Sequence, residues 1–284
     1  MCRWLIYKGN DFNINELLFT PENSIIKQSY KKPYTPFLNI PNNRDHHINV
    51  DGFGIGWYYN DNNLCIYVNT KPPWNDKNLY NISKILYSKL LFAHIRAIKP
   101  LSESIVHDYN CHPFYYKNIM WMHNGEISTI NLIKKNIVNN FNNLIMNNIK
   151  GNTDSEYAFG LFLSFLDIGD LINNKIFFNK EYIKNLVIRF LRYLLYLSNN
   201  SSNKNNINLS LNFALTDGNI IICTRYLNKD HEDPPSLYYS LNDKHLIVSS
   251  EPINKNNSDW VLIGKNKIVI INEFNVINEF SLNI

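Results

Sequence analysis

Long apolar runs are missing from this sequence of 284 residues. A helix needs roughly 18 apolar residues or more to cross a bilayer, and the best candidate, 186–197, is interrupted by Arg189 and Arg192. After Arg3 only residues 4–7 are apolar, which is shorter than the apolar core of a secretory signal peptide. The sequence therefore predicts neither membrane insertion nor export, and we expect a cytoplasmic protein.

Cysteine is scarce, and so is an excess of charge of either sign. Four cysteines do not make the dense disulfide framework of a small secreted protein. The net charge is only +4 and no cluster of Lys and Arg stands out, so we expect no nucleic-acid partner. Charged residues make up 18% of the chain, below the roughly 25% of average soluble domains. Asparagine fills the difference with 49 residues, which we attribute to biased coding because Lys, Ile, Tyr and Phe are abundant too.

What the sequence does contain is enough apolar material for a sizeable core, since 45% of its residues are hydrophobic. Apolar residues at helical spacing predict helices over 76–90, 128–141, 153–166 and 181–197. Thr153 and Glu156 have the spacing of a capping box at the start of the third helix. Strands are expected over 3–8, 52–59, 64–69, 90–96, 115–125, 211–216, 219–225, 236–240, 245–249, 260–264 and 268–272.

The order of these segments is strands, then helices, then strands again, which argues against a doubly wound parallel sheet. We expect an α+β fold in which two antiparallel sheets are covered by helices. Residues 1–284 are expected to form a single domain, because no linker separates independent parts. Two Asn-rich stretches, near 139–148 and 198–208, are expected to be insertions in surface loops.

Cys2 is the first candidate for chemistry because it directly follows the initiator methionine. Removal of Met1 would leave one residue with a thiol, whose ordinary pKa is about 8.5, and an α-amine, whose ordinary pKa is about 7.7–8.0. The amine could then act as the general base for the thiol, so that nucleophile and base belong to the same residue. Position alone does not decide this, since any protein can carry a cysteine at its second residue.

Three further polar groups could bind a substrate. Arg96 ends a predicted strand and could clamp a carboxylate, although a surface ion pair is the more common role. Asn124 and Gly125 could offer an amide and a free N–H to an oxyanion, or they could simply form a turn. Asp154 could bind an ammonium group, or it could only stabilise the N-terminus of its helix.

Cys111 and the histidines allow two other arrangements. Cys111-His112 with His94 and His123 could form a zinc site or a papain-like Cys–His pair. Zinc sites favour paired ligands at short fixed spacings, and only one close pair exists here. We therefore expect no metal and no other cofactor. His112 is expected to be structural, and His94 and His123 to orient their neighbours.

Taken together, the candidate residues belong to motifs that follow one another in a fixed order. They are Met1-Cys2-Arg3-Trp4, Asp51-Gly52-Phe53-Gly54, His94 with Arg96, Asn110-Cys111-His112-Pro113-Phe114, His123-Asn124-Gly125-Glu126-Ile127 and Thr153-Asp154-Ser155-Glu156. This series resembles the class II glutamine amidotransferases, which are N-terminal-nucleophile hydrolases. Later stretches such as Ser249-Ser250-Glu251-Pro252 are similar to one branch, which contains the amidotransferase-like subunit of a cytosolic glutathione-degrading complex.

The resemblance implies a fold and a role for each candidate. The fold would be a four-layer αββα sandwich of two antiparallel sheets between helices. Cys2 would be the nucleophile and its amine the general base, and Asn124 and the Gly125 N–H would form the oxyanion hole. Arg96 would hold the α-carboxylate of a γ-glutamyl group and Asp154 its α-ammonium.

The resemblance also implies a substrate and a partner. The expected reaction is cleavage of a γ-glutamyl amide through a cysteine thioester, with glutathione or glutamine as substrate. The expected partner is a metallopeptidase-like subunit. One alternative is a glutaminase subunit that delivers ammonia to a separate synthase, and another is a catalytically silent scaffold subunit.

One segment departs from the family pattern. Where related sequences commonly carry a small residue, Thr and Gly after the Arg-Ala pair, this chain has Ile98-Lys99-Pro100-Leu101. The usual Thr helps to hold the substrate carboxylate, and Lys99 could supply a charge in its place or point to solvent. This departure bears on the substrate preference of the site, and the intact Cys2, Arg96 and Asp154 argue against a silent scaffold.

Overall fold

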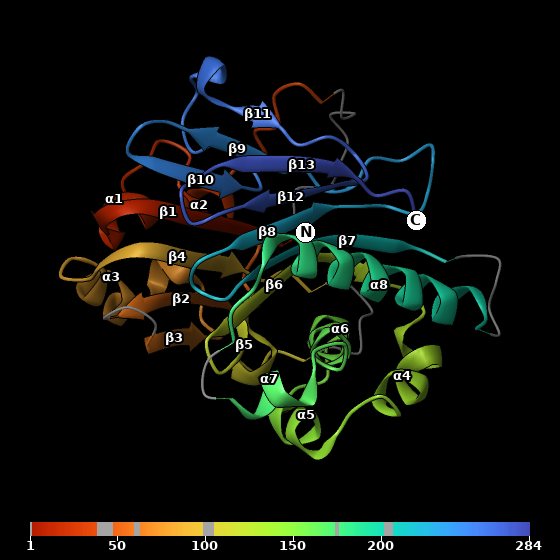
Figure 1. The fold of residues 1–284 in the computed structure, drawn as a ribbon. Coiled ribbons are helices and arrows are strands. Elements are labelled where there is room, and N and C mark those ends of the chain that lie inside the picture. The colour runs from red at the N-terminus through yellow and green to blue at the C-terminus, as the bar shows by residue number, and fades with distance from the viewer. Residues whose placement is uncertain (1, 39–47, 60–62, 99–104, 174–175, 202–206) are drawn as a thin grey trace. The chain divides into compact units, whose positions relative to one another are not determined.

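The structure is a computed structural model that describes residues 2–38, 48–59, 63–98, 105–173, 176–201 and 207–284. The contacts within the chain divide it into two compact units. Unit 1 comprises residues 1–113 and 235–264, and unit 2 comprises residues 114–234 and 265–284. Each unit is built around one antiparallel sheet (Figure 1).

The sheet of unit 1 has seven strands in the order β11-β9-β10-β1-β4-β2-β3. Their bounds are β1 Arg3–Asn13, β2 Phe53–Tyr59, β3 Asn63–Asn69, β4 Tyr87–Ile95, β9 Tyr238–Leu241, β10 His245–Ser249 and β11 Val261–Leu262. Unit 1 also contains the helices α1 Ile14–Leu18, α2 Ile25–Gln28 and α3 Lys77–Ser83, and the 3-10 turns Pro73–Asn75, Asp108–Asn110 and Asn257–Asp259.

Strand β1 is central in this sheet because its first half is apolar on both faces. Residues 4–8 are all buried, and β1 pairs with β10 on one side and with β4 on the other. Leu5 lies opposite both Ser249 and Ala93 in these ladders. The first residues of the chain are therefore held between two strands, which leaves Cys2 at a well-defined place.

The sheet of unit 2 has six strands in the order β13-β12-β8-β7-β6-β5. Their bounds are β5 Phe114–Tyr116, β6 Ile119–Ile127, β7 Leu209–Thr216, β8 Ile221–Arg225, β12 Lys267–Ile271 and β13 Ile277–Ser281. The helices of this unit are α4 Ile130–Val138, α5 Asn143–Asn148, α6 Asp154–Leu163, α7 Ile168–Ile172 and α8 Lys180–Asn199.

The core of unit 2 forms where α6 and α8 pack with strands β6 and β7. Trp121 of β6 lies between Phe213 of β7, with ring centroids 4.4 Å apart, and Phe159 and Phe162 of α6. Phe190 of α8 meets the Trp121 ring edge-on at 5.9 Å. Such aromatic pairs bury large apolar areas and prefer offset or edge-on geometry. This packing holds α6 against β6, the strand that carries Asn124 and Gly125.

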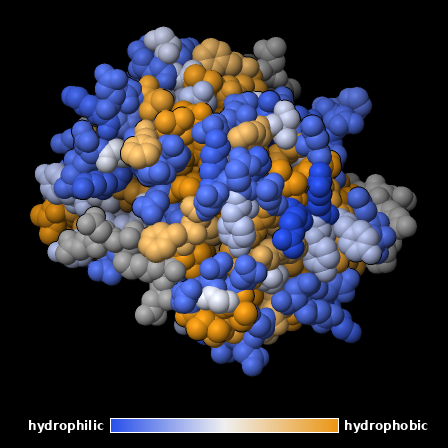
Figure 2. Space-filling model, viewed as in Figure 1, coloured by the Kyte–Doolittle hydropathy of each residue, from blue (hydrophilic) through white to orange (hydrophobic). Residues whose placement is uncertain are grey.

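Helix α8 follows the predicted amphipathic pattern, with its apolar positions buried. On the face seen in Figure 2, hydrophilic and hydrophobic residues are interspersed. Among the described residues, no helix is long and apolar enough to span a membrane.

Two of the expected elements end in different places in the structure. The helix expected over 76–90 stops at Ser83, and β4 begins at Tyr87. Residues 87–90 alternate between exposed and buried, which is the period of a strand, and Ile82, counted as a core position, is 40% exposed. The strand expected over 115–125 is broken at Lys117, whose positive φ of 54° makes the turn between β5 and β6.

Three other segments differ from expectation. The stretch near 139–148, expected as a loop, contains helix α5, because Asn142 caps it and Ile145 is buried. Of the second Asn-rich stretch, α8 takes residues 198–199, β7 begins at Leu209, and 202–206 lie outside the described residues. Strand β13 is an addition to the expected strands: it pairs with β12, and its residues are half-buried or exposed, so they lack the apolar run that marks a core strand.

Candidate active site

Cys2 lies immediately before β1, beside the residues that follow β4. In the β1–β4 ladder Arg3 is opposite Ile95. Cys2 therefore comes directly before the paired part of β1, and Arg96 comes directly after the paired part of β4. The Ala97 N–H donates to the Cys2 sulfur at 3.4 Å, and the thiol contacts the Ala97 carbonyl oxygen at 3.7 Å. Cys2 is half-buried, so its thiol is held in place but remains open to a ligand.

Arg96 is almost completely buried and is held by main-chain groups. Its Nη1 donates to the carbonyl oxygen of Ile105 at 2.9 Å and to that of Asp51 at 3.4 Å. Its own N–H donates to the carbonyl of Gly52 at 2.7 Å. The interpretation of Arg96 as a surface residue is wrong, because this residue is only 4% exposed.

The Gly52 motif lets the chain around Cys111 approach β2 closely. Gly52 has a φ of +135°, and a Cβ at this residue would lie 2.5 Å from the Cys111 sulfur. A Cβ on Gly54 would lie 2.1 Å from the carbonyl oxygen of His112. These glycines are therefore required for packing next to Arg96, which explains why the motif belongs to the site.

Cys111 is not a second nucleophile at neutral pH. Burial raises the pKa of Cys111 to about 11, and the charge of Arg96 lowers it only in part. The thiol donates weakly to the carbonyl oxygens of His107 and Asn69, at 3.6 and 3.9 Å. A papain-like role needs a thiolate or a nearby base, and this buried thiol stays protonated.

Within unit 1 the rings of His94 and His112 pack against each other, with centroids 4.1 Å apart. Among the described residues, no three side chains of His, Cys, Asp or Glu come together as a metal site. A cavity of about 340 Å³ in unit 1 contains none of the predicted site residues. It is lined by Phe19, Ser24, Ile26, Lys27, Tyr30, Trp74, Asp76, Lys77 and Tyr80.

In unit 2, Asn124 and Gly125 lie inside strand β6 rather than at its end. The Asn-Gly turn considered as the simpler interpretation is wrong, because β6 continues to Ile127 and pairs with β7 throughout. Asn124 is 2% exposed, and its Oδ1 has no hydrogen-bond partner among the described residues. Leaving a buried amide oxygen without a partner costs free energy.

Gly125 can only be glycine at this place in β6. A Cβ on this residue would lie 1.8 Å from the carbonyl oxygen of Ser210 and 2.7 Å from His123 Nε2. His123 Nε2 itself lies 3.0 Å from that carbonyl oxygen, and its Nδ1 lies 2.8 Å from Ser155 Oγ. His123 thus bridges Ser155 and the Ser210 carbonyl and occupies the space that a side chain at 125 would need, and the expectation that it orients Asn124 stays a prediction.

Asp154 is tied to the end of the same strand. One carboxylate oxygen accepts from the Ile127 N–H at 2.9 Å, and the other accepts from the Ser155 N–H at 2.8 Å and lies 3.2 Å from the Ser155 hydroxyl oxygen. The structure therefore brings Asp154 together with the strand that carries Asn124 and Gly125. Each oxygen has lone pairs beyond these bonds, so the carboxylate can still accept from a ligand.

The expected capping box at the start of α6 is only half present. Thr153 Oγ1 accepts from the Glu156 N–H at 3.2 Å, as expected. The Glu156 carboxylate, however, accepts from the N–H groups of Lys150 and Gly151, both at 2.8 Å. It binds the preceding loop instead of returning to the N-cap, and this holds the loop that leads into Asp154.

Lys99, expected as a substrate-binding residue, lies outside the described residues together with 100–104. Cys2 and Arg96 lie together in unit 1, and Asn124, Gly125 and Asp154 lie together in unit 2. Every residue of these two groups belongs to one of the motifs that were singled out in the sequence.

The comparison with protein families shows which family the chain belongs to. The model of the family described as "Glutamine amidotransferases class-II" matches residues 31–281. The chain belongs to the class II glutamine amidotransferases. The family expected from the motifs is therefore confirmed.

Individual relatives agree with this assignment. The probable glutamine amidotransferase DUG3 of Saccharomyces cerevisiae is 34% identical over 251 residues, which cover 84% of this chain and 68% of that protein. A glutamine aminotransferase class-II domain protein from Silicibacter pomeroyi has a TM-score of 0.68 at 22% identity, covering 99% of this chain and 100% of that one. The glutamine phosphoribosylpyrophosphate amidotransferase of B. subtilis has a TM-score of 0.62 at 13% identity, covering 99% of this chain and 49% of that one.

The structural likeness establishes the fold of this class II amidotransferase. The expected α+β class with two antiparallel sheets, the N-terminal-nucleophile hydrolase fold, is confirmed. The prediction that residues 1–284 act as one domain stays a prediction, since the contacts divide the chain into two units.

Sequence reasoning gave no role to two residues next to Cys2. Arg3 Nη1 donates to the Cys2 carbonyl oxygen at 3.0 Å, and Arg3 Nε lies 2.5 Å from a carboxylate oxygen of Glu251. The sequence signals were present in the Met-Cys-Arg-Trp and Ser-Ser-Glu-Pro motifs, but nothing in them shows that residues so far apart in the chain would pair.

Proposed function

We propose that this class II amidotransferase hydrolyses γ-glutamyl amides with the Cys2 thiol as nucleophile. The observation that carries the proposal is the placement of a half-buried thiol beside a buried arginine where β1 begins and β4 ends. An arginine fork binds a carboxylate in two-point fashion. Removal of Met1 would free the α-amine of Cys2 to act as the base for its own thiol.

The first half of the reaction would form a thioester. The α-amine takes the thiol proton and the sulfur attacks the γ-carbonyl carbon of the substrate. The negative charge on the carbonyl oxygen is stabilised by the Asn124 amide and the Gly125 N–H, in the manner of an oxyanion hole. The bond from carbon to the leaving nitrogen then breaks, and that nitrogen receives the proton held by the α-ammonium.

The second half would release glutamate. Water gives a proton to the α-amine and attacks the thioester carbon. The carbon–sulfur bond then breaks, and the α-ammonium returns its proton to the sulfur, which regenerates both the thiol and the free amine. Arg96 would hold the α-carboxylate and Asp154 the α-ammonium of the glutamyl group in both halves. These roles use only side-chain and main-chain groups of the chain itself, and no cofactor is needed.

We propose glutathione as the substrate and a metallopeptidase-like subunit as the partner, in the cytosol. The support is the likeness to yeast DUG3 together with the late motifs, such as Ser249–Pro252, that are similar to the glutathione-degrading branch. Lys99 would then bear on the recognition of the part of the substrate beyond the glutamyl group.

The second candidate function is a glutaminase that delivers ammonia to a separate synthase. The family assignment favours it, because amidotransferases of class II use glutamine. The third, a silent scaffold, is disfavoured by the intact Cys2, Arg96, Asn124 and Asp154.

A turnover assay separates the three functions. The processed protein, carrying only a C-terminal tag, is assayed for glutamate release from glutathione and from glutamine. It is tested alone and with the proteins it captures from a lysate, identified by mass spectrometry. Preference for glutathione with a metallopeptidase-like partner supports the proposal, and preference for glutamine with a synthase replaces it by the second function. No release from either substrate by any of these samples would leave the scaffold.

Cys2→Ala and Cys111→Ala complete the experiment. Cys2→Ala should release no glutamate, whereas Cys111→Ala should retain turnover because its thiol is protonated and buried. The reverse result would move the nucleophile to Cys111 and overturn the proposed mechanism.

A further inference from the structure

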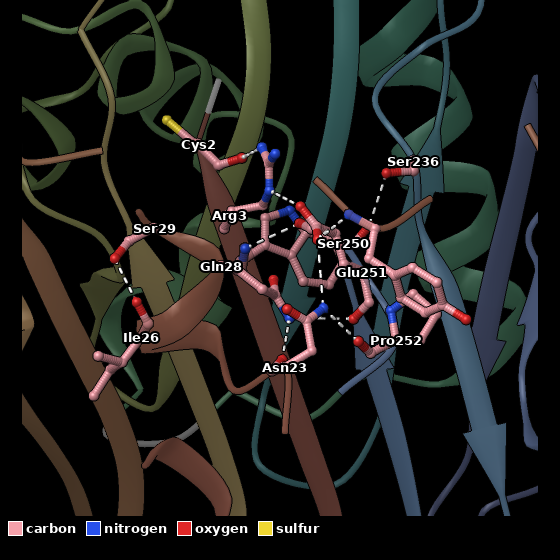
Figure 3. A network of polar contacts seen from close by, with 12 residues as sticks. Cys2, Arg3, Asn23, Ile26, Gln28, Ser29, Ser236, Ser250, Glu251 and Pro252 are labelled. Atoms are coloured by element: carbon pink, nitrogen blue, oxygen red, sulfur yellow. Dashed lines mark hydrogen bonds and ion pairs between the residues drawn. The ribbon is translucent and has the colours of Figure 1, made fainter. Parts of the chain in front are cut away.

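The residues that follow Met1 are held by a buried ion pair that lies outside the proposed catalytic groups. Glu251 is completely buried, and one of its carboxylate oxygens lies 2.5 Å from Arg3 Nε. Arg3 Nη1 donates to the Cys2 carbonyl oxygen at 3.0 Å. In Figure 3 the Cys2 carbonyl points toward the guanidinium, and the sulfur points away from it.

Glu251 is itself fixed by several donors. Its second carboxylate oxygen accepts from the Tyr34 N–H at 2.8 Å and from Asn23 Nδ2 at 3.4 Å. Its main-chain carbonyl accepts from Gln28 Nε2 at 3.3 Å. A carboxylate satisfied in this way is a rigid anchor, so the position of Arg3 is determined by a network that reaches across unit 1 (Figure 3).

Trp4 and Ser250, which follow Arg3 and precede Glu251 in the chain, form a second link between the same two segments. Trp4 N–H donates to Ser250 Oγ at 3.0 Å, and Ser250 N–H donates to the Trp4 carbonyl at 2.9 Å. Ser236 Oγ in turn donates to the Ser250 carbonyl at 2.8 Å. The segment after β10 therefore binds Arg3 through Glu251 and Trp4 through Ser250, beyond the point where the β1–β10 ladder ends at Leu5 and Ser249.

After removal of Met1, Cys2 would have no preceding peptide group. Its carbonyl would then be the main group through which the protein fixes its conformation. Rotation about the bond between Cα and the carbonyl carbon of Cys2 would swing both the thiol and the α-amine. The bond from Arg3 opposes this rotation. A misplacement of about 1 Å in a reacting group can cost about 100-fold in rate.

We propose that Arg3 and Glu251 are positioning residues that hold the Cys2 nucleophile and its amine in the reactive geometry. This inference rests on the proposed function of Cys2. It adds a charge effect, because the amine and the carbonyl of Cys2 belong to the same residue and the guanidinium therefore lies near both. Without the Glu251 carboxylate, the guanidinium charge of Arg3 would make protonation of the amine harder, and without the guanidinium the carboxylate charge of Glu251 would make it easier.

Other charged or titratable groups around Cys2 stay constant in the test. Arg96 follows β4, and His94 lies opposite Trp4 in the β1–β4 ladder. The Asp51 carboxylate accepts from the Ile98 N–H at 2.7 Å. None of these is altered in the variants below, so a change in pH dependence between variants reports on the Arg3–Glu251 pair.

The experiment compares Arg3→Gln, Arg3→Lys and Glu251→Gln in the processed protein. We expect kcat for γ-glutamyl-p-nitroanilide to fall by about 10–100-fold with KM changed less than about threefold. The acidic limb of the kcat/KM profile, where the amine must lose its proton, should move to lower pH in Glu251→Gln and to higher pH in Arg3→Gln. Arg3→Lys should have a lower kcat than the wild type. The acidic limb of its kcat/KM profile should stay at nearly the wild-type pH, because the positive charge is retained.

Asp76→Asn is the matched control. Asp76 is a buried carboxylate in the same unit that accepts from Tyr67 and Asn69 side chains and has no contact with Cys2. We expect this variant to lose stability without a change in kcat or in the acidic limb. The inference would be overturned if the acidic limb of the kcat/KM profile moved in the same direction in Glu251→Gln and Arg3→Gln. It would also be overturned if both variants kept the wild-type kcat.

Two measurements keep the test decisive. If a single variant does not fold, Arg3→Leu combined with Glu251→Met removes both charges and leaves none unpaired in the interior. This double variant must still turn over the substrate more slowly than the wild type. The rate of Cys2 alkylation by iodoacetamide, followed by peptide mass spectrometry, reads the positioning without any substrate and should change in the variants but not in Asp76→Asn. A protein with no γ-glutamyl turnover but with these alkylation changes would refute the proposed function and leave the positioning role intact.

Discussion

Nδ1 of His123 and the hydroxyl oxygen of Ser155 lie 2.8 Å apart, and this contact decides which way one proton points. The other ring nitrogen, Nε2, lies 3.0 Å from the Ser210 carbonyl oxygen, which can only accept. In a neutral ring Nε2 therefore carries the proton and Nδ1 accepts from Ser155. The hydroxyl has a single proton, so it is then not donated to the Asp154 carboxylate 3.2 Å away.

This arrangement keeps one oxygen of Asp154 available for a ligand as long as His123 is neutral. Burial lowers the pKa of His123 below its usual 6.5, against the opposing effect of the Asp154 and Glu126 carboxylates. A protonated ring would donate from Nδ1 to the Ser155 oxygen and turn the hydroxyl proton toward Asp154. The neutral form thus favours a carboxylate that accepts from a substrate ammonium.

The first prediction concerns stability and pH. Because the folded state holds His123 neutral, it binds fewer protons than the unfolded state at acidic pH. The contribution of His123 is therefore complete above pH 6.5 and is lost as the pH falls through the lower folded pKa. We expect the free energy of unfolding by urea, measured from pH 8 to pH 5, to fall more steeply in the wild type than in His123→Gln. The difference in slope can reach about 1.4 kcal/mol per pH unit, and parallel curves would contradict it.

The second prediction concerns Asp154 and the substrate ammonium. A site built around a charged partner rejects an analogue that leaves it unpaired, by roughly 10⁴-fold where the fit is tight. We expect γ-glutamyl-p-nitroanilide to be hydrolysed far faster than its N-acetylated form, and Asp154→Asn to lose most of this preference. Glu126→Gln changes a carboxylate in β6, the strand to which Asp154 is hydrogen-bonded, and should retain it. Equal rates on both substrates in the wild type would remove Asp154 from its proposed role.

The third prediction concerns the fork geometry of Arg96. Lysine keeps the charge but has no planar fork, so it cannot hold a carboxylate at two points while bonding to the Ile105 carbonyl. We expect Arg96→Lys to lower kcat/KM for γ-glutamyl substrates by about 100-fold or more, since two charge-assisted bonds are affected. Arg225→Lys, at another buried arginine, is the control and should retain kcat/KM. Near-normal kcat/KM in Arg96→Lys would count against the carboxylate clamp.

The fourth prediction concerns the N-terminus. With Met1 retained, the nitrogen of Cys2 is an amide without basicity, and loss of a general base costs about 10²–10⁴ in rate. We expect intact-mass measurement to show an active form that lacks Met1. A residual N-terminal tag should abolish turnover, whereas the same tag at the C-terminus should not. If the N-terminally tagged protein has wild-type turnover, Cys2 does not act through its amine.

The fifth prediction concerns the backbone at Gly125. A Cβ at this residue would lie 1.8 Å from a main-chain oxygen, and a main-chain group cannot move aside as a flexible side chain can. We expect Gly125→Ala to destabilise the fold by about 1–3 kcal/mol or more, as overpacked sites do. Gly169→Ala is the matched control, because nothing lies within 4 Å of a Cβ there and the residue is helical, so a small gain is expected. Urea unfolding curves compare the two, and equal stabilities would show that β6 and β7 can separate at this point.

Helix α8, the central strands and the positions of the candidate residues could be predicted from the sequence. Local periodicity reports burial directly: Ile183, Leu186 and Phe190 repeat at helical spacing, and all are buried in the structure. Cys2, Arg96 and Asp154 were proposed as site residues because each combines a reactive or charged group with a position at the end of an element or beside the initiator methionine.

The ends of elements were harder to predict because they depend on contacts that no local pattern records. Residues 76–90 have helical spacing, yet α3 ends at Ser83 because the chain from Tyr87 pairs with the far end of β1. Pairing with a strand distant in sequence overrides local preference, since a full ladder of hydrogen bonds and buried side chains outweighs the small differences in intrinsic propensity.

The sequence by itself determined the fold class, the family and the chemical groups of the site. The tertiary structure alone decided which of those groups are buried, paired or free. Cys2 and Cys111 are the same residue type, but only one thiol is open, because Gly52 admits Cys111 into the packed interior. Arg3 and Glu251 are separated by 248 positions and become partners only when β1 and β10 pair. Electrostatics depends on distance and burial in space, and neither quantity is written in the order of residues along the chain.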